Sequence, residues 1–280
     1  MKSPAERQDS RLMREMFHTI APRYDFISRV LSFGMDGRWK RLGVAKASLP
    51  ENAVVLDLAC GTGDFSRLVL ERLPRATAIA ADITERMLQL AHASGLNDAV
   101  CSDAADLPFA DNSFDCVFIG YGLRNCPDVK KAIREIQRVT KPGGSMVNID
   151  FFLPANLILR RIYLGYLFAQ GAIWGLLLHG RARVYTYLPD SLRNFLTMQQ
   201  FTALLDEFGY SPVIARLIFL AESASTGRPK NSVETKRQAI TESGRPLRRD
   251  WRRGKTVRRR PVAQRPPRSL RTFSLSARNP

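Results

Sequence analysis

Three aspartates and two glycines are the residues of this chain best suited to holding a small ligand. The stretch LDLACGTGDF contains Asp57, Gly61 and Gly63 directly after an apolar run. Asp82 and Asp103 follow two further short apolar runs. Glycines let a backbone approach a ligand closely, and the first turn of a following helix offers free amide groups. The pattern predicts a binding loop beside a row of carboxylates.

The spacing of this loop argues against a dinucleotide. A dinucleotide-binding loop has a third glycine where this chain has Ser66. It also avoids a carboxylate such as Asp57, because carboxylate and phosphate repel each other strongly at low effective dielectric. A ligand with a cationic amino acid end and an adenosine, but no phosphate, removes that objection. S-adenosylmethionine is such a ligand.

Each aspartate has a predicted role in holding this cofactor. Asp57 faces the cationic end, and Asp82, 19 residues after Gly63, accepts hydrogen bonds from both ribose hydroxyls. Asp103 meets the adenine amine while the amide of Ala104 meets a ring nitrogen. One such aspartate alone is more typical of a helix cap or a turn. Three at consecutive strand ends favour a binding site.

The elements that position these residues alternate between short apolar runs and longer amphipathic runs. Strands are predicted at 53–59, 77–82, 99–103, 114–122 and 145–152, and helices at 64–73, 84–94 and 129–140, with a turn at 141–144. This alternation is typical of an α/β fold with a doubly wound, Rossmann-like, mostly parallel sheet and helices on both faces. Ligands of such sheets lie at the carboxyl ends of the strands, where the three aspartates fall.

The charge of the chain is concentrated at its C-terminus. Residues 222–280 carry 17 Lys and Arg against 4 Asp and Glu, a net charge of +13 out of +17 for the whole chain. This segment is also rich in proline and poor in large apolar residues, a composition that cannot form a core. We predict a domain boundary near 222–230 and a disordered tail after it.

The cysteines and the N-terminal residues indicate the cellular compartment in which we expect the protein to work. The four cysteines have no C-x-x-C spacing and the three histidines are not clustered, so we expect neither a metal site nor a disulfide framework. Reduced thiols are typical of the cytoplasm. The N-terminus mixes charges of both signs and lacks the apolar region of a secretory signal. The expected location is cytoplasmic.

Several motifs resemble a known family. LDLACGTGD, DAADLPFADNSFD, GYGLRNCPD and RVTKPGG resemble the class I methyltransferases. Together with FHTIAPRYDFISRVLSFGMDGRWKR and VYTYLPDSLRNF, they resemble the ubiquinone/menaquinone biosynthesis C-methyltransferases (the UbiE/MenG group) from about residue 16 to 220. The resemblance implies S-adenosylmethionine-dependent methylation of a ring carbon in a prenylated quinol, of demethylmenaquinol or ubiquinone-precursor type. It also implies Thr62, Asp82, Asp103 and Ala104 as cofactor contacts.

The resemblance also suggests how the chain is divided. We expect an N-terminal helical lid at 1–50, a methyltransferase domain at 51–227 and an Arg/Pro-rich tail at 228–280. Gly120, expected in the cofactor site, stands where the family often has serine, so one hydroxyl contact is missing. DFF at 150–152 and the arginines of GRAR also depart from the family pattern.

These departures keep two alternatives open. A methyltransferase for another small aromatic or lipid acceptor is favoured by the DFF and GRAR segments. A nucleic-acid-directed methyltransferase is suggested by the arginine tail, since clustered positive charge binds phosphates. Against the second alternative, the basic residues lie in a detachable tail and not around the predicted site.

Three residues are candidates for the chemistry of the acceptor. A quinol ring carbon becomes nucleophilic when a neighbouring hydroxyl loses its proton, so a base or a fixed positive charge is needed near that oxygen. Arg124 is predicted to stabilise the phenolate or to orient a water. Tyr185 and Asp150 are candidates for proton handling. Each also has a structural interpretation, as a loop tie, a packing residue and a strand-end turn residue respectively.

One apolar segment, 162–178, interrupts the domain with a single polar residue. Its 17 residues are at the lower limit for crossing a bilayer. A spanning helix would split the fold, so we favour a cap that admits a prenyl chain, with a core helix as the alternative. This segment and the basic tail predict transient, peripheral contact with the inner face of the membrane.

Overall fold

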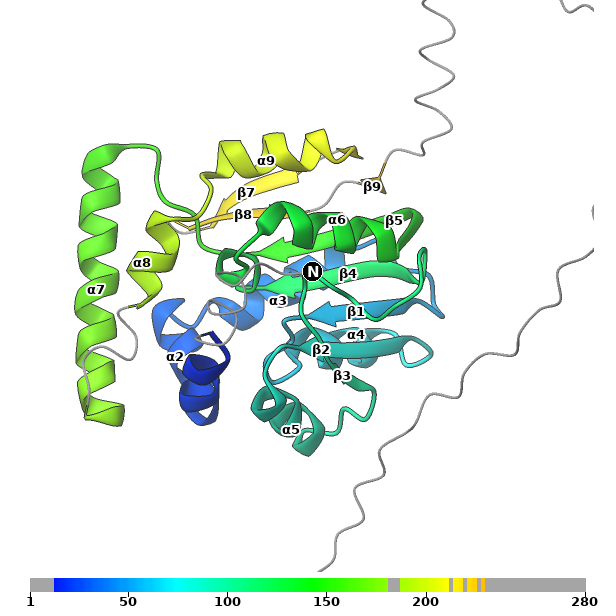
Figure 1. Cartoon of the computed structure of the whole chain (residues 1–280), viewed down its shortest axis with the longest axis horizontal. Helices are drawn as coiled ribbons and strands as arrows, with labels where there is room; N and C mark the ends of the chain where they lie inside the picture. Colours follow the sequence, from blue (N-terminus) through cyan, green and yellow to red (C-terminus); the bar gives the residue numbers. More distant parts are fainter. Residues whose placement is uncertain (1–12, 181–186, 212–213, 219–220, 226–227, 230–280) are drawn as a thin grey trace, which may run out of the picture.

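The structure is built on a parallel sheet extended by antiparallel strands. In the computed structural model, the residues described are 13–180, 187–211, 214–218, 221–225 and 228–229. The main sheet has the order β3-β2-β1-β4-β5-β8-β7 (Figure 1). Its strands are β1 (Val54–Leu58), β2 (Thr77–Asp82), β3 (Ala99–Cys101), β4 (Phe114–Gly120), β5 (Thr140–Ile149), β7 (Ile214–Ile218) and β8 (Ala221–Ser225). The first five are parallel, β8 is antiparallel to β5, and β7 is antiparallel to β8. The predicted doubly wound sheet is confirmed.

The helices follow the predicted alternation. They are η1 (Ala21–Arg23), α2 (Tyr24–Leu31), α3 (Asp36–Lys46), α4 (Asp64–Arg72), α5 (Glu85–Ala93), η2 (Leu123–Asn125), α6 (Val129–Val139), α7 (Leu157–His179), α8 (Tyr187–Arg193) and α9 (Met198–Glu207). Residues 13–20 are also helical. The largest departure concerns β5, which begins at Thr140 although we predicted a strand from 145. The predicted turn at 141–144 lies inside this strand, where the pairing with β4 shifts.

The two faces of the sheet are covered by different helices (Figure 1). Val55 and Phe118 share a core with α3 and α4. Leu56 and Val117, one position along each strand, share a second core with α6 and α9. Adjacent strand residues point to opposite faces, which is why these strands are apolar on both sides. The alternation therefore holds the carboxyl ends of β1 and β4 side by side.

Those two strand ends carry backbone strain. Ala59, after β1, has φ 51°, and Tyr121, after β4, has φ 58°. Non-glycine residues adopt the left-handed region rarely, and such residues cluster at functional sites. A side chain at Gly122 would bring its Cβ within 2.7 Å of the Ala59 Cβ. The turns are thus packed directly against each other, and glycine is required at 122.

The predicted tail lies almost wholly outside the described residues. Its first two residues form β9 (Arg228–Pro229), which pairs with β6 (Tyr210–Ser211). The remainder, residues 230–280, for which we predicted disorder, lies outside the described part of the chain. The division into lid, domain and tail remains a prediction.

Candidate active site

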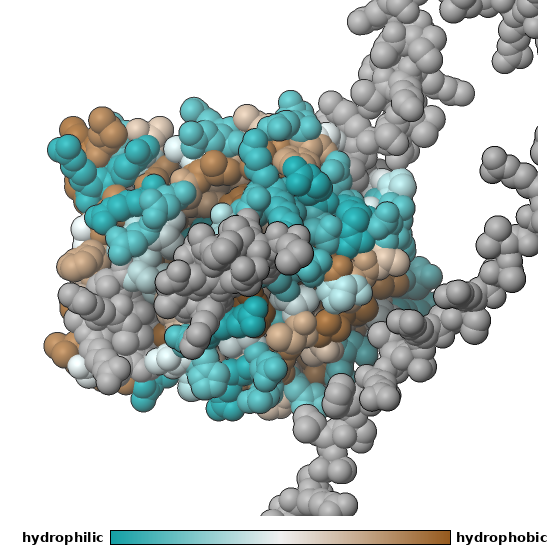
Figure 2. Space-filling model, in the orientation of Figure 1, coloured by the Kyte–Doolittle hydropathy of each residue, from teal (hydrophilic) through white to brown (hydrophobic). Residues whose placement is uncertain are grey.

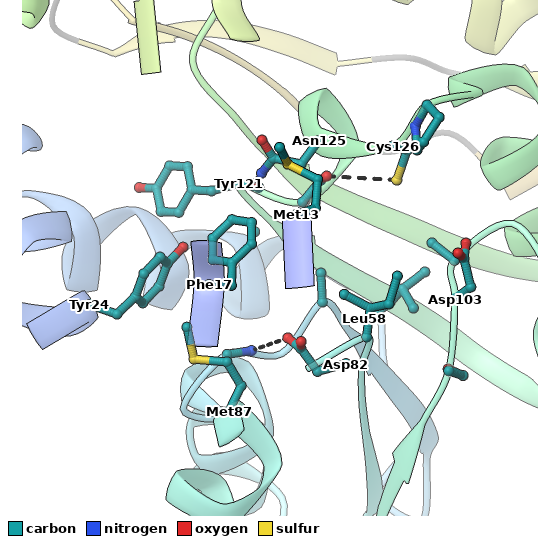
Figure 3. A pocket seen from close by; sticks show the side chains of 18 residues that line it. Met13, Phe17, Tyr24, Leu58, Asp82, Met87, Asp103, Tyr121, Asn125 and Cys126 are labelled. Atoms are coloured by element: carbon teal, nitrogen blue, oxygen red, sulfur yellow. Dashed lines mark hydrogen bonds between the residues drawn. The ribbon is translucent and has the colours of Figure 1, made fainter. Parts of the chain in front are cut away.

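A cavity lies at the carboxyl ends of β1, β2 and β4, under the N-terminal helices (Figure 3). Its empty volume, mouth included, is about 690 Å³. It is lined by Met13, Phe17, Tyr24, Leu58, Ala59, Gly61, Asp82, Ile83, Met87, Ser102, Asp103, Ala104, Gly120, Tyr121, Gly122, Asn125, Cys126 and Pro127. We call this the first cavity.

Five of the eight residues predicted to bind the cofactor line the first cavity. They are Gly61, Asp82, Asp103, Ala104 and Gly120. They come from the carboxyl ends of four strands, β1 to β4, which parallel pairing brings to one edge of the sheet. The convergence agrees with the predicted arrangement, while the contacts of each residue with a cofactor remain predictions.

Asp82 holds the glycine turn in place. Its carboxylate accepts one hydrogen bond from the Gly61 amide at 3.0 Å and another from the Thr84 amide at 2.8 Å. Burial raises the pKa of Asp82, and the backbone amides oppose that rise. A carboxylate has about four lone-pair sites, so acceptor capacity is left for ligand hydroxyls. The side chain is therefore able both to fix the loop and to bind a ribose.

Asp57 is placed differently from the prediction. It is 1% exposed, does not line the first cavity, and accepts hydrogen bonds from the Ser66 amide at 2.8 Å and the Ser66 hydroxyl at 2.9 Å. These bonds tie the first turn of α4 to β1. Burial raises the pKa of Asp57 to about 7, against the hydrogen bonds from Ser66. We therefore assign Asp57 to positioning the glycine loop.

The raised pKa of Asp57 has a measurable consequence for stability. Between about pH 4 and pH 7 the folded protein holds a proton that the unfolded chain has lost, so the free energy of unfolding falls as pH rises through this window. Asp57→Asn keeps an acceptor for Ser66 and removes the titration. We expect urea unfolding of this variant to show a flatter pH dependence than the wild type. If the free energy of unfolding changes equally with pH in both proteins from pH 4 to 7, Asp57 is not the cause of the pH dependence.

The other two predicted loop residues, Thr62 and Gly63, lie against α2 and Leu96. The Thr62 hydroxyl donates a hydrogen bond to Asp25 of α2 at 2.9 Å. Gly63 precedes α4 and lies against Leu96. Neither lines the first cavity. The structure thus links Thr62 to the helices that cover the cavity.

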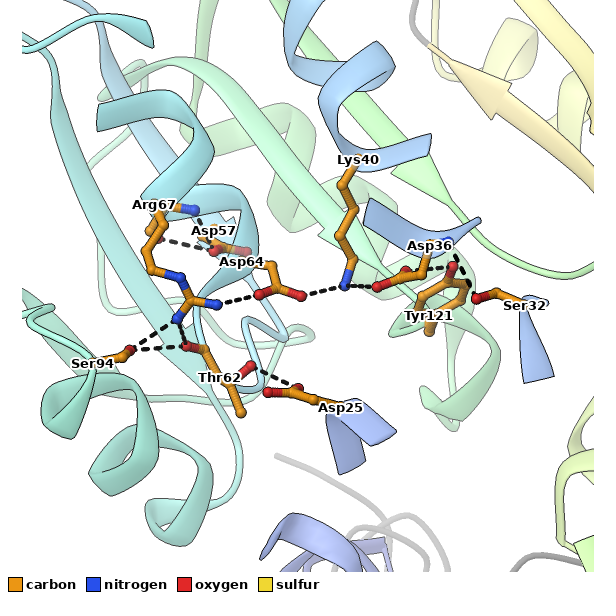
Figure 4. A network of polar contacts seen from close by, with 11 residues as sticks. Asp25, Ser32, Asp36, Lys40, Asp57, Thr62, Asp64, Arg67, Ser94 and Tyr121 are labelled. Carbon is orange, nitrogen blue, oxygen red and sulfur yellow. Dashed lines mark hydrogen bonds and ion pairs between the residues drawn. The ribbon is translucent and has the colours of Figure 1, made fainter. Parts of the chain in front are cut away.

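A buried lysine joins α3 to the first residue of α4, directly after the glycine loop (Figure 4). Lys40 of α3 is 6% exposed and pairs with Asp36 at 2.9 Å and with Asp64, the first residue of α4, at 2.7 Å. The Tyr121 hydroxyl donates to Asp36 at 2.8 Å. Burial alone would lower the pKa of Lys40, but the two carboxylates raise it, so the lysine stays charged. This network fixes the Tyr121 ring at the wall of the first cavity.

Two of the predicted catalytic residues form a buried ion pair. Arg124 Nη1 lies 2.5 Å from Asp150 Oδ1, and their side chains are 4% and 0% exposed. Asp150 also accepts from the Phe151 amide at 2.9 Å. Burial raises the pKa of Asp150 against the effect of Arg124. Burial would lower the pKa of Arg124, but Asp150 and two tyrosines raise it. The guanidinium is a fixed positive charge.

This ion pair borders a second cavity. The lining residues are Ile20, Tyr24, Ile27, Ser28, Leu31, Tyr121, Arg124, Phe151, Tyr187 and Leu188. The Arg124 guanidinium carbon lies 5.7 Å from the ring centre of Tyr121 and 5.9 Å from that of Phe151. Tyr24 and Tyr121 line both cavities. The second cavity is an aromatic pocket with one cation, directly beside the first.

Tyr185, the third predicted catalytic residue, lies outside the described residues. Tyr187, two positions later, lines the second cavity. Burial raises the pKa of Tyr187, and Arg124 opposes that rise. Tyr185 therefore remains a prediction, and Tyr187 is the tyrosine that the structure places beside Arg124.

Unpaired polar atoms test whether a polar ligand suits the first cavity. Ser102 Oγ and Asn125 Oδ1 are buried and have no hydrogen-bond partner among the described residues. Both residues line the first cavity. Buried polar atoms usually find partners, so their presence here favours a ligand that supplies them. The amino and hydroxyl groups of S-adenosylmethionine fit this requirement.

Sequence comparison settles the family. The sequence model of the ubiE/COQ5 methyltransferase family matches residues 5–216. The chain belongs to this family. It is 37% identical over 207 residues to the ubiquinone/menaquinone biosynthesis C-methyltransferase UbiE of Geotalea daltonii. That alignment covers 71% of this chain and 87% of the relative. The chain is also 37% identical over 219 residues to UbiE of Pseudomonas putida strain GB-1, covering 74% and 84%.

Solved structures agree on the fold. A SAM-dependent methyltransferase from Aquifex aeolicus superimposes with a TM-score of 0.53 at 17% identity, covering 76% of this chain and 98% of that one. A SAM-dependent methyltransferase from Thermotoga maritima gives 0.53 at 19% identity, covering 77% and 99%. At these identities the likeness shows the fold alone.

Membership of the ubiE/COQ5 family confirms the resemblance read from the motifs. The chain is a methyltransferase, and S-adenosylmethionine is its methyl donor. The first cavity, at the strand ends where ligands of such sheets bind, is the candidate site for it.

Several residues that line the two cavities were not predicted from the sequence, among them Tyr24, Tyr121, Ser102 and Asn125. Tyr24 lies in the APRYD motif and Tyr121 in YGLRN, so both were noticed only as parts of a resemblance. Asn125 also lies in YGLRN, whereas Ser102 precedes Asp103 without any spacing that marks it. For Ser102, proximity to a predicted residue is the one available signal.

Proposed function

We propose that the protein transfers a methyl group from S-adenosylmethionine to a ring carbon of a prenylated quinol, of demethylmenaquinol or ubiquinone-precursor type, in quinone biosynthesis. The curated relatives carry the name ubiquinone/menaquinone biosynthesis C-methyltransferase. The single observation that supports the acceptor most directly is the second cavity. It offers aromatic walls for a flat ring and one buried cation for an ionised hydroxyl.

The first cavity would hold and orient the donor. Bound S-adenosylmethionine supplies an electrophilic methyl group on a sulfonium. Gly61 gives close backbone approach, Asp82 accepts from the ribose, and Asp103 and Ala104 face the adenine. Because Tyr24 and Tyr121 line both cavities, a ring in the second cavity would lie next to the donor. Holding two reactants in contact supplies much of the rate of such a transfer.

Arg124 would make the acceptor nucleophilic. Its guanidinium is charged and buried among aromatic rings, so it favours the phenolate form of a quinol hydroxyl. Its Nε atom is buried and has no hydrogen-bond partner within the described ranges. Asp150 holds the other side of the guanidinium and fixes its orientation. Asp150 then acts mainly as a positioning residue, and Tyr187 joins Tyr185 as a candidate for proton handling.

The DFF departure does not favour a different acceptor. Phe152 is 0% exposed and packs against Phe195 and Phe201, with ring centres 5.3 and 5.4 Å away. In this departure from the family pattern, Phe152 therefore fills the core. Phe151 does line the second cavity, and its ring suits a quinol ring. The quinol remains the acceptor that the described residues support best.

The first test of this proposal needs no assumption about the acceptor. We would incubate the protein with methyl-labelled S-adenosylmethionine and a bacterial quinone-precursor extract, and identify the labelled molecules by mass spectrometry. We expect label in prenylated quinones. Label in other lipids, in small aromatic molecules or in nucleic acid would select one of the alternatives.

We also infer that the protein works at the membrane surface, because a prenylated acceptor resides in the bilayer. The net charge of +13 in residues 222–280 would attract anionic headgroups by about 1 kcal/mol for each basic residue near the surface. We expect cosedimentation with anionic vesicles at low salt and substantial release at high salt, since screening acts within about 10 Å at 0.1 M.

Removing residues 230–280 keeps β9 and should abolish most of the salt-sensitive binding, with methyl transfer to a soluble acceptor unchanged. Neutral vesicles are the control. If the full-length protein does not bind anionic vesicles at low salt, the tail has a different role. Loss of most activity on truncation would favour a nucleic-acid acceptor.

A further inference from the structure

The helix α7 stands apart from the sheet (Figure 1). It is 23 residues long, and it is the one helix in the described part of the chain that is long and apolar enough to cross a membrane. One side packs inward, since Leu167 is 1% exposed in the core and Trp174 packs on Ile20 and Ile27. A helix held in this way by the domain cannot span a bilayer. Only 17% of the most apolar 18-residue stretch of α7 is buried, however, so α7 is not a core helix either.

The opposite side of α7 is apolar and exposed. Ile158, Ile162, Phe168, Ile173, Leu176 and Leu177 are between 52% and 69% exposed. We call these six residues the outer face. Figure 2 shows apolar residues at the edge of the molecule that α7 forms. Contiguous apolar surface of this extent marks an interaction site.

The charged residues of α7 itself have one sign. The sequence of α7 contains Arg160 and Arg161 and no acidic residue. Arg161 lines a groove with Phe168 and with Arg193 of α8, which also pairs with Asp190 at 2.9 Å. Two guanidinium groups above an apolar floor match a phosphate headgroup attached to acyl chains.

The apolar surface continues toward the second cavity through α2. Phe26 is 47% exposed and its ring lies edge-on to Trp174, with centres 5.3 Å apart. Phe33, which follows α2, is 59% exposed and stacks on Tyr166 at 5.6 Å. Ile27 lines the second cavity and packs in the cluster that includes Trp174. The seam between α2 and α7 therefore leads from the outer face to the candidate acceptor site.

We propose that the outer face of α7 lies in the interface of an anionic phospholipid bilayer, with the helix parallel to the membrane plane. Arg161 and Arg193 lie at the phosphates, and the prenyl chain of the acceptor runs along the seam between α2 and α7. The proposal rests on the proposed function for the acceptor. A second copy of the chain is the competing occupant, but α7 offers no carboxylate to pair with the arginines of a partner copy.

The test uses the full chain carrying Leu176→Asp and Leu177→Asp, both at positions more than half exposed. The matched control carries the same added charge on α9, as Gln199→Asp and Ala203→Asp, also at exposed positions. Binding to anionic vesicles is measured at high salt, where attraction by the basic tail is screened. We expect the α7 variant to bind about tenfold more weakly than wild type, and the α9 control to bind equally well.

Two acceptors separate this inference from the proposed function. The α7 variant should lose turnover of long-chain demethylmenaquinol in vesicles and keep turnover of a short-chain, water-soluble quinol. If wild type methylates neither, the proposed function fails, while vesicle binding still tests α7. Unchanged vesicle binding by the α7 variant would overturn the inference. So would a wild-type dimer in analytical ultracentrifugation that the α7 variant dissociates without losing vesicle binding.

Discussion

Replacing Arg124 with alanine is expected to lower turnover by about 10²–10³-fold while changing the affinity for S-adenosylmethionine less than about threefold. The guanidinium lines the second cavity and not the first, so its loss should affect the acceptor alone. Turnover at saturating donor and calorimetric titration of the donor measure the two effects separately.

The same substitution also leaves Asp150 as an unpaired buried carboxylate. Breaking a buried pair typically costs about 3–5 kcal/mol of stability, so a loss of folded protein must be distinguished from a loss of chemistry. The double variant Arg124→Gln, Asp150→Asn removes both charges together and should recover stability without recovering turnover. Recovery of turnover would make the ion pair purely structural. A donor affinity that fell as far as turnover would place Arg124 in the cofactor site.

Asp82→Ala is expected to weaken binding of S-adenosylmethionine by roughly 1.5–3 kcal/mol. The ribose hydroxyls lose a charged acceptor, and the amides of Gly61 and Thr84 lose the carboxylate that holds the turn. Gly61→Val should be worse, because Gly61 has φ 55°, a conformation that a β-branched residue rarely adopts, and because its side chain would occupy space at the wall of the first cavity.

Calorimetry with a matched surface variant tests the assignment of Asp82. Asp98→Ala removes a carboxylate from an exposed position that does not line the first cavity, and should leave donor affinity unchanged. Asp82→Asn keeps acceptor capacity without charge and should fall between wild type and Asp82→Ala. Equal affinity for wild type and Asp82→Ala would remove Asp82 from the cofactor site.

The fold and the first cavity were predictable because their signals are local. Strand β2 begins and ends where the apolar run TAIAAD does. Asp82 is the last residue of β2 and Asp103 comes two residues after the end of β3, so parallel pairing alone brings them to one edge. Asp57 follows the same rule in sequence, yet it lies within β1 and its side chain turns to Ser66. Spacing located the loop without distinguishing the residues that bind from those that support it.

The second cavity was not predictable, because its parts are far apart in the chain. Tyr24, Arg124 and Tyr187 come from helices that pack together only through tertiary contacts. Lys40 pairs with Asp36 four residues before it, a spacing that helical geometry alone can indicate, but its second partner, Asp64, lies 24 residues away and nothing local marks it. In α7, apolar residues occupy both sides of the helix, so periodicity does not tell a buried face from an exposed one.

The most direct test of the central claim is the position of the transferred methyl group. Purified protein would be incubated with methyl-labelled S-adenosylmethionine and reduced demethylmenaquinone in detergent, and the product analysed by mass spectrometry and NMR. We expect a single labelled methyl on the ring carbon next to a hydroxyl, formed by wild type and hardly at all by Arg124→Ala. Label on an oxygen, or no transfer to any prenylated quinol by a folded, donor-binding protein, would contradict the claim.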